Sequence, residues 1–159
     1  MSVMDTQTVL QPEDLDLNLV MSLQKTLLTQ LSSVTIISNY MERPDKVAMQ
    51  SVKQWIEMEV ISFPVKDKHG IVQFRCRVKL SEANPGRTAL ALKDSLINAL
   101  NAPSFQIYNC ATPSNPTAIS GVWGALRLLS KEVPGGAFEN VHEEIVRYHL
   151  VCWQDGIID

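Results

Sequence analysis

The sequence predicts an α+β fold, with an antiparallel-rich β-sheet and two amphipathic helices packed on one face. Apolar and polar residues alternate strictly between Val72 and Leu80, which is typical of a half-buried strand. Leucines recur every four residues from Leu19 to Leu31, and this spacing predicts an amphipathic helix over residues 16–32. A second helical pattern follows the strands directly, at residues 88–100. Strands and helices grouped in this way indicate an α+β architecture.

Length and composition favour one globular domain. The chain has 159 residues, of which 45% are hydrophobic and 19% charged, so it can bury a substantial core. Its N-terminus lacks the basic and apolar regions of a signal peptide, and no apolar stretch approaches the ~20 residues of a membrane-spanning helix. We expect an N-terminal arm (1–15), one α+β domain (16–154) and a C-terminal tail (155–159), with no membrane association.

Net charge and cysteine content narrow the possible functional classes of the protein and its cellular compartment. A net charge of −3 and a pI near 5.6 disfavour a dedicated nucleic-acid-binding protein, which normally needs a clustered positive surface. Cys76, Cys110 and Cys152 are odd in number, widely spaced and flanked by apolar residues. This pattern predicts buried thiols in a reducing compartment rather than a disulfide framework.

The break at residues 66–70, read as a five-residue hairpin loop, fixes an expected register for the two strands beside it. The predicted apolar pairs are Val65 with Ile71, Val60 with Cys76, Met58 with Val78 and Ile56 with Leu80. The predicted charged pairs on the opposite face are Glu59 with Arg77 and Glu57 with Lys79. Pro64 lacks an amide donor, so the first strand should become an edge or a bulge near the loop.

The rest of the sequence predicts one helix, several strands and three long connections. A helix after the hairpin should lie back on its apolar face and end before Pro103. Residues 39–54 form a long polar connection, which is typical of an arm or a mobile loop. The other predicted strands are 34–37, 105–110, 118–129 and 144–153, and the other predicted loops are 111–117 and 131–142.

No set of residues predicts catalysis or metal binding. His142, His149 and Cys152 suggest a metal cluster at first, but residues 149 and 152 of a strand point to opposite faces, and no fourth ligand has zinc-like spacing. The adjacent acids Glu143 and Glu144 are read as solvated charge rather than an acid–base pair. We therefore expect no enzyme, no bound metal and no cofactor.

We interpret the glycine and tryptophan residues of the predicted strands as structural rather than ligand-binding. The segment 120–124 is glycine-rich but lacks the lysine and spacing of a phosphate-binding loop, so its glycines predict a bulge or a close backbone approach. Trp55, Trp123 and Trp153 could line a ligand cage. Tryptophans on alternating strands are more often anchors in a core or a subunit interface, and we favour that reading.

The order of elements resembles the tail-terminator and tail-completion proteins of tailed bacteriophages. The features that carry the resemblance are the leading helix, the long arm, the charged hairpin at 55–80, the helix at 88–100 and the final strand with its Arg-Tyr-His-Leu-Val-Cys-Trp run. The resemblance covers residues 16–153. Proteins of that family form a ring, usually a hexamer, that ends tail-tube polymerisation and meets the head–neck connector, and they catalyse no reaction.

The resemblance implies a virion structural protein that assembles in the host cytoplasm, with itself, the tail-tube protein and connector proteins as partners. DNA would pass near it in the lumen, which a net charge of −3 permits. The candidate interface residues are Arg43, Asp45, Glu57, Glu59, Arg75, Arg77, Lys79, Trp123 and Trp153. The long segments 39–54, 111–117 and 131–142 are natural arms for contacts of this kind.

Three other classes stay open at this stage. The chain could be another phage neck, tail-tube or baseplate subunit. It could be a small nucleic-acid-binding module that uses the face of Arg75, Arg77 and Lys79. It could also be a small-ligand enzyme with a pocket near His142 and His149.

Overall fold

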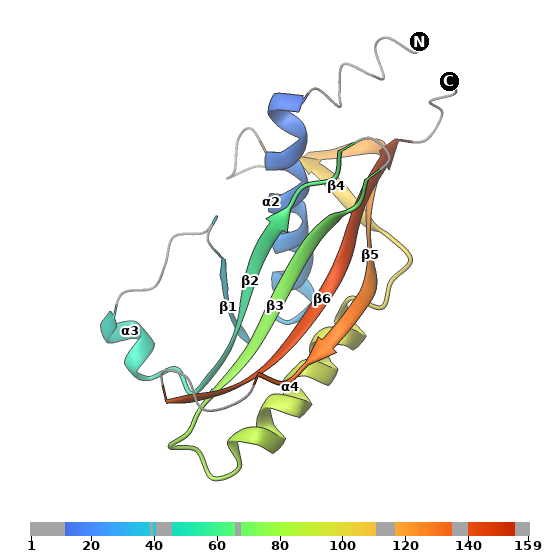
Figure 1. Ribbon diagram of the computed structural model, residues 1–159. Coiled ribbons are helices and arrows are strands. Elements are labelled where there is room, and N and C mark those ends of the chain that lie inside the picture. Colours follow the sequence, from blue (N-terminus) through green and yellow to red (C-terminus); the bar gives the residue numbers. More distant parts are fainter. Residues whose placement is uncertain are drawn as a thin grey trace, which may run out of the picture.

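The computed structural model describes residues 12–38, 40, 46–65, 68–110, 117–134 and 140–154. Three helices and six strands follow one another along the chain in these ranges. They are α2 (Pro12–Gln30), β1 (Thr35–Ser38), α3 (Lys46–Gln50), β2 (Gln54–Ser62), β3 (Gly70–Lys79), α4 (Pro85–Ala99), β4 (Phe105–Asn109), β5 (Thr117–Glu132) and β6 (Val141–Gln154) (Figure 1).

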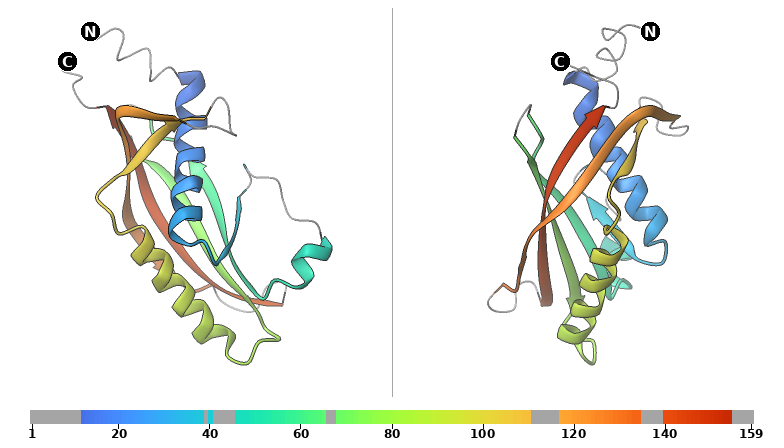
Figure 2. Two further views of the ribbon diagram at one scale, coloured as in Figure 1. Left: turned by 180° about the vertical axis from the view of Figure 1, so that it is seen from behind. Right: turned by 90° about the vertical axis from the view of Figure 1, so that its right-hand side faces the viewer.

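The six strands form one sheet in the order β1-β2-β3-β6-β5-β4. β1 pairs with β2 in parallel, and every other neighbouring pair is antiparallel. The long helices α2 and α4 cover the same face of this curled sheet (Figure 2). The predicted α+β fold with two helices on one face is therefore confirmed.

The core lies between the two long helices and the sheet. The leucines of the four-residue repeat, Leu19 to Leu31, are all buried, and on α4 Leu92 and Leu96 are buried. Phe74 lies at the centre of β3 and contacts the Tyr148 ring edge-on, with 5.7 Å between ring centroids. Each buried leucine or phenylalanine stabilises the fold by about 1.5–3 kcal/mol, so this layer holds the helices on the sheet.

Helix α2 is also fixed by polar side chains on its buried side. Asn18 accepts a hydrogen bond from the Cys110 amide at 2.9 Å, and Ser22 accepts one from the Tyr108 amide at 2.7 Å. Gln24 accepts a hydrogen bond from the Ser38 hydroxyl at 2.6 Å. These bonds join α2 to the two outer strands of the sheet, where backbone groups would otherwise lack partners. No helix in the described ranges is long and apolar enough to cross a membrane.

Helix boundaries differ from the predicted ones for local reasons. α2 begins at Pro12, four residues before the predicted start, and α4 begins at Pro85 rather than Thr88. Proline suits the first turn of a helix because its missing amide hydrogen has no partner there. The prediction that α4 ends before Pro103 is confirmed, since the helix ends at Ala99.

The predicted register of the β2–β3 hairpin is wrong by four residues, since Met58 lies opposite Phe74 rather than Val78. The pairs Val65–Ile71, Val60–Cys76, Met58–Val78 and Ile56–Leu80 do not form; those observed include Ile56–Cys76, Met58–Phe74, Val60–Val72 and Ser62–Ile71. Val65 and Lys68 exchange two backbone hydrogen bonds of 3.1 and 2.8 Å, so the chain turns sooner than a five-residue loop would allow.

An irregularity at Ile61 accounts for the rest of the four-residue difference between the predicted and the observed register. The pairing shifts between Val60 and Ser62, which confirms the bulge predicted from Pro64. β1 pairs with β2 only from Trp55 to Met58, so the outer side of β2 has no strand partner near the bulge within the described ranges. Because the total shift of register is even, the apolar residues remain on the helix-covered face.

Several predicted loops are shorter than expected. The polar connection at 39–54 contains helix α3, and Gln54 already belongs to β2. β5 continues to Glu132 and β6 begins at Val141, so the predicted loop at 131–142 is reduced at both ends. The predicted loop at 111–117 lies outside the described residues, apart from Thr117, which begins β5. The predicted arm at 1–15 is wrong for residues 12–15, which belong to α2; residues 1–11 and the predicted tail at 155–159 also lie outside the described residues.

Gly121 and Gly124 confirm the structural reading of the glycine-rich segment. Gly121 has a φ of 77°, a left-handed conformation that residues with a Cβ rarely adopt. A Cβ added at Gly124 would lie 2.4 Å from the Phe105 ring. This close approach lets Phe105 of β4 pack over β5 and into the core.

Candidate functional site

The face of the sheet that the long helices α2 and α4 leave uncovered holds a network of charged side chains on the central strands. Arg77 donates to Glu143 at 2.9 Å, and Arg75 donates to the other oxygen of the same carboxylate at 3.0 Å. Arg77 also donates to Glu57 at 3.3 Å. Glu57 accepts a further hydrogen bond from the Trp55 indole at 3.1 Å. One acid on β6 thus joins two arginines on β3, and a second acid on β2 completes the network.

The predicted charged pairs Glu59–Arg77 and Glu57–Lys79 are wrong, because the true register places Glu57 opposite Arg75 and Glu59 opposite Gln73. The charges are also less solvated than expected. Arg77 and Glu143 are each 9% exposed, and Gln73 is 2% exposed, although all three lie on the uncovered face. β3 lies between β2 and β6, so long neighbouring side chains shield its polar residues on both sides.

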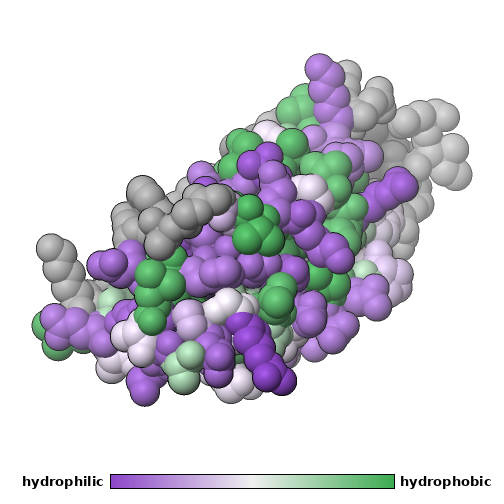
Figure 3. Space-filling model, turned by 60° about the horizontal axis from the view of Figure 1, so that its bottom comes forward, coloured by the Kyte–Doolittle hydropathy of each residue, from purple (hydrophilic) through white to green (hydrophobic). Residues whose placement is uncertain are grey.

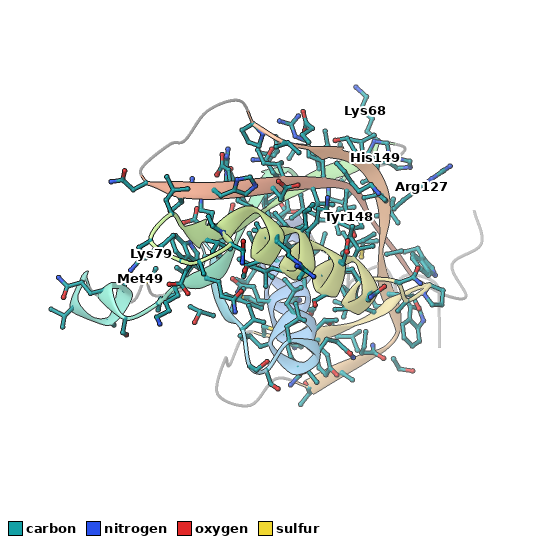
Figure 4. The ribbon with its side chains drawn as sticks, turned by 90° about the horizontal axis from the view of Figure 1, so that it is seen from below. Met49, Lys68, Lys79, Arg127, Tyr148 and His149 are labelled. Carbon is teal, nitrogen blue, oxygen red and sulfur yellow. The ribbon has the colours of Figure 1, made fainter. Side chains whose placement is uncertain are left out.

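Lys79 has a separate role at one end of the same face. Its ammonium group donates to the backbone carbonyls of Met49 and Gln50 at 3.1 and 2.9 Å. These carbonyls end helix α3, where cations are favourable. A small apolar cluster beneath α3 consists of Ile37, Trp55 and Val141, with Met49 and Val52 packed against it. Lys79 and Met49 lie at the end of the molecule opposite Lys68, Arg127 and His149 (Figure 4).

The other candidate interface residues are scattered. Trp123 and Trp153 lie opposite one another on β5 and β6, and Trp153 is 39% exposed. Trp55 is buried in the cluster beneath α3, which fits the reading of tryptophans as core anchors. Glu59 is exposed on β2. Arg43 and Asp45 lie outside the described residues.

A second polar group lies on the helix-covered face, beneath α4. Glu144 is 2% exposed, and its two oxygens lie 2.8 Å from His142 and 3.4 Å from the Lys93 ammonium. Burial, the largest cause, and the Glu144 carboxylate together raise the pKa of the neighbouring Cys76 thiol to about 12, while Lys93 opposes the shift. Such a thiol is inert, because the thiolate is the reactive form. The group therefore stabilises the junction between α4 and the sheet.

Tyr148 lies in the same layer. Its hydroxyl is buried without a hydrogen-bond partner. Burial, with a smaller contribution from Cys76, raises the pKa of this phenol to about 12. A buried hydroxyl of this kind costs about 1–3 kcal/mol relative to a satisfied one. The phenol ring offsets the cost through its edge-on contact with Phe74.

We expect the stability of the protein to fall in alkali, and Cys76→Ala to flatten that fall. A raised pKa in the folded state means that the thiol contributes fully below its ordinary value of 9.0 and loses its contribution between pH 9 and about 12. The free energy of unfolding is expected to fall by about 1 kcal/mol per pH unit in this range. Chemical denaturation at pH 8 and pH 11 measures it, and equal slopes for the variant and the parent chain would contradict the assignment.

A cavity of about 260 Å³ lies between α2, the end of α4, and β4. The hydroxyls of Thr26 and Thr29 donate to backbone carbonyls of their own helix, and the Gln106 amide donates to three strand carbonyls. The Lys25 ammonium lies over the Tyr108 ring, 5.2 Å from its centroid. These polar side chains of the lining thus already have partners, and the described lining residues form no nucleophile–base pair.

β5 has a long free edge. β4 pairs with β5 only up to Gly124, whereas β6 pairs with it to Glu132, so residues 125–132 have a strand on one side alone within the described ranges. Figure 1 shows β5 continuing past the end of β4. Leu128 and Leu129 on this stretch are 43% and 46% exposed. On the lower face of the molecule, apolar residues form separate spots on a mainly hydrophilic surface (Figure 3).

His149 and Cys152 lie on opposite faces of the sheet, as their positions on one strand predicted. His142 binds Glu144 on the helix-covered face, whereas His149 lies opposite Arg127 on the other face and Cys152 lies opposite Gly124. His149 instead contacts His69, with 3.3 Å between their Nδ1 atoms. The described residues contain no group of three or more histidine, cysteine or acidic side chains that could hold a metal.

The structure brings together Glu57, Arg75 and Arg77 among the candidate interface residues and adds Glu143, which had been read as solvated charge. The signal that could have found Glu143 is its place on an alternating strand, where residues 141, 143 and 145 share a face. The His69–His149 contact joins residues 80 positions apart and has no local signal. In comparisons with known proteins, the chain matches no protein-family model and has no significant match among curated proteins.

Proposed function

We propose that this chain is a non-enzymatic assembly subunit that forms a closed ring, and that the ring is a phage tail terminator. The observation that carries the proposal is a pair of strand edges, on opposite sides of one sheet, that have no strand partner within the described residues. On one side is the edge of β5 at residues 125–132, and on the other is β1. A terminator of this kind acts by assembly and not by chemistry.

Free edges support assembly because unpaired backbone groups on a strand can pair with another chain. The two edges differ in sequence and length, so a contact between them is head-to-tail. Repetition of such a contact closes a ring when the rotation between subunits is a simple fraction of a turn. The exposed leucines at 128 and 129 add apolar area to the contact.

The polar network on the uncovered face supports a structural role for its arginines. Arg75, Arg77 and Lys79 would have to bind phosphates in a nucleic-acid-binding module, yet each is held by acids or carbonyls of its own chain. Breaking those bonds would offset much of the gain from binding a phosphate. We therefore favour assembly over nucleic-acid binding. Steep salt dependence of DNA binding by the purified protein would reverse this preference.

The ring is tested by replacing Leu129 with lysine, a charged residue that natural proteins place on strand edges to prevent pairing. We expect the parent chain to assemble with concentration and Leu129→Lys to need at least about tenfold more protein, since loss of one buried leucine costs about 1.5–3 kcal/mol. Light scattering coupled to size-exclusion chromatography measures the assembly.

The matched control is Leu90→Lys on α4, because Leu90 and Leu129 are both 46% exposed. This variant should assemble like the parent chain. A parent chain that stays monomeric at high concentration would refute the ring, as would equal effects of the two lysines. The terminator role is tested separately, by adding the chain to growing tubes of the tail-tube protein from the same genome. Shortened tubes are expected, and tubes of unchanged length would refute that role.

A further inference from the structure

The strongest unassigned feature is the contact between His69 and His149 at the loop end of the β2–β3 hairpin. His69 directly precedes β3, and His149 lies on β6 opposite Ile71. Their Nδ1 atoms are 3.3 Å apart and their ring centroids 4.9 Å apart, with an angle of 53° between the rings. The His69 ring is exposed and that of His149 half-buried.

The two nitrogens are within hydrogen-bonding distance, at the long end of the range, with one ring as donor and the other as acceptor. Hydrogen bonds from a protein nitrogen usually span about 2.7–3.2 Å. Two imidazole nitrogens bound to one tetrahedral Zn²⁺ at about 2.0–2.1 Å lie about 3.3–3.4 Å apart. The observed 3.3 Å therefore matches the separation of two ligands on one zinc ion. The His69 ring is exposed and can rotate, which turns its own Nδ1 lone pair relative to that of His149.

We propose that His69 and His149 form a two-residue site for Zn²⁺, with both Nδ1 atoms as ligands. Imidazole nitrogen is a preferred ligand of zinc, whereas calcium and magnesium prefer oxygen. Within the described residues the site has these two protein ligands, which leaves the other coordination positions of Zn²⁺ open. Both proposed ligands lie outside the β5 and β1 edges of the proposed ring, whereas the neighbouring Arg127 lies on the β5 edge.

Two cations near the site set its affinity. Lys68 precedes His69 in sequence, and Arg127 lies directly across the β5–β6 ladder from His149 (Figure 4). Both side chains are exposed and can extend into water, where their charge is screened. Their repulsion weakens Zn²⁺ binding without preventing it, so removal of the arginine charge should strengthen binding.

The test is calorimetric titration of the untagged, full-length protein with Zn²⁺. We expect one equivalent to bind, and His69→Gln or His149→Gln to weaken binding by at least the order of tenfold, since even an outer partner of a metal ligand contributes 10–100-fold. The matched control is His142→Gln, because His142 is the third of three histidines and lies on the opposite face beside Glu144. It should leave Zn²⁺ binding unchanged.

A further variant separates the metal site from its alternatives. Arg127→Gln should strengthen Zn²⁺ binding about two- to threefold, in line with removal of one screened charge. Absence of binding by the folded parent chain would overturn the proposal and leave the two rings as a simple aromatic contact. Equal losses for the three histidine variants, or weaker binding after Arg127→Gln, would overturn it as well.

Discussion

Glu143→Ala is expected to lower the free energy of unfolding by about 3 kcal/mol, the scale on which removal of one partner destabilises a buried ion pair. The variant leaves Arg75 without the acid at 3.0 Å and takes from Arg77 its shortest recorded bond, of 2.9 Å. The Arg77 side chain is 11% exposed, so water cannot replace the lost acid efficiently. Denaturation by urea, followed by circular dichroism, measures the change.

The control for this prediction is Glu132→Ala on β5. Glu132 lies 3.2 Å from Arg147, but the two side chains are 48% and 45% exposed, and such a pair contributes at most about 1 kcal/mol. Glu143→Ala should therefore destabilise the protein well beyond Glu132→Ala. Equal effects would show that the central network is solvated after all.

Gly124→Ala is expected to destabilise the protein by about 1–3 kcal/mol, the usual cost of overpacking a core. The added Cβ would lie 2.4–2.8 Å from three atoms of the Phe105 ring, closer than packed carbon atoms approach. The second-site change Phe105→Leu should recover part of this loss, because it removes the clashing ring atoms. Thermal and chemical denaturation of the single and double variants measure the coupling.

Gly86→Ala is the control, because it is expected to raise the free energy of unfolding where Gly124→Ala lowers it. Gly86 lies in the first turn of α4, and a Cβ there would meet the His142 ring at an ordinary distance of 3.6 Å. Alanine loses less conformational freedom than glycine when a helix forms, so the variant should gain about 0.5–1 kcal/mol. Destabilisation by both changes would contradict the steric account of Gly124.

The fold class could be predicted from the sequence because periodicity reports which residues share a face. Leu19 to Leu31 and the alternating residues of β3 are buried together, as their spacing implies. The hairpin register could not be fixed in this way. A shift of four residues at Met58 leaves the apolar set on the same face, so periodicity does not distinguish the true register from the predicted one.

The site depended on pairings between distant strands. Arg77 and Glu143 are 66 positions apart, and they meet because β6 lies next to β3 rather than next to β2. No turn or local pattern specifies that arrangement. The same holds for His69 and His149, whose contact requires the hairpin and the final strand to be in register. Local secondary structure could therefore be predicted from the sequence. The polar contacts between strands that are distant in sequence could not.

The place of β6 has a consequence for how the molecule folds. This strand of 14 residues is the last element of the described chain, yet it lies between β3 and β5 and joins the β1-β2-β3 half of the sheet to the β5-β4 half. During synthesis, the two halves emerge first and have no strand contact with each other until β6 leaves the ribosome. Such non-local pairing slows folding and exposes strand edges while it is incomplete. The native sheet is therefore completed only when this strand enters its centre.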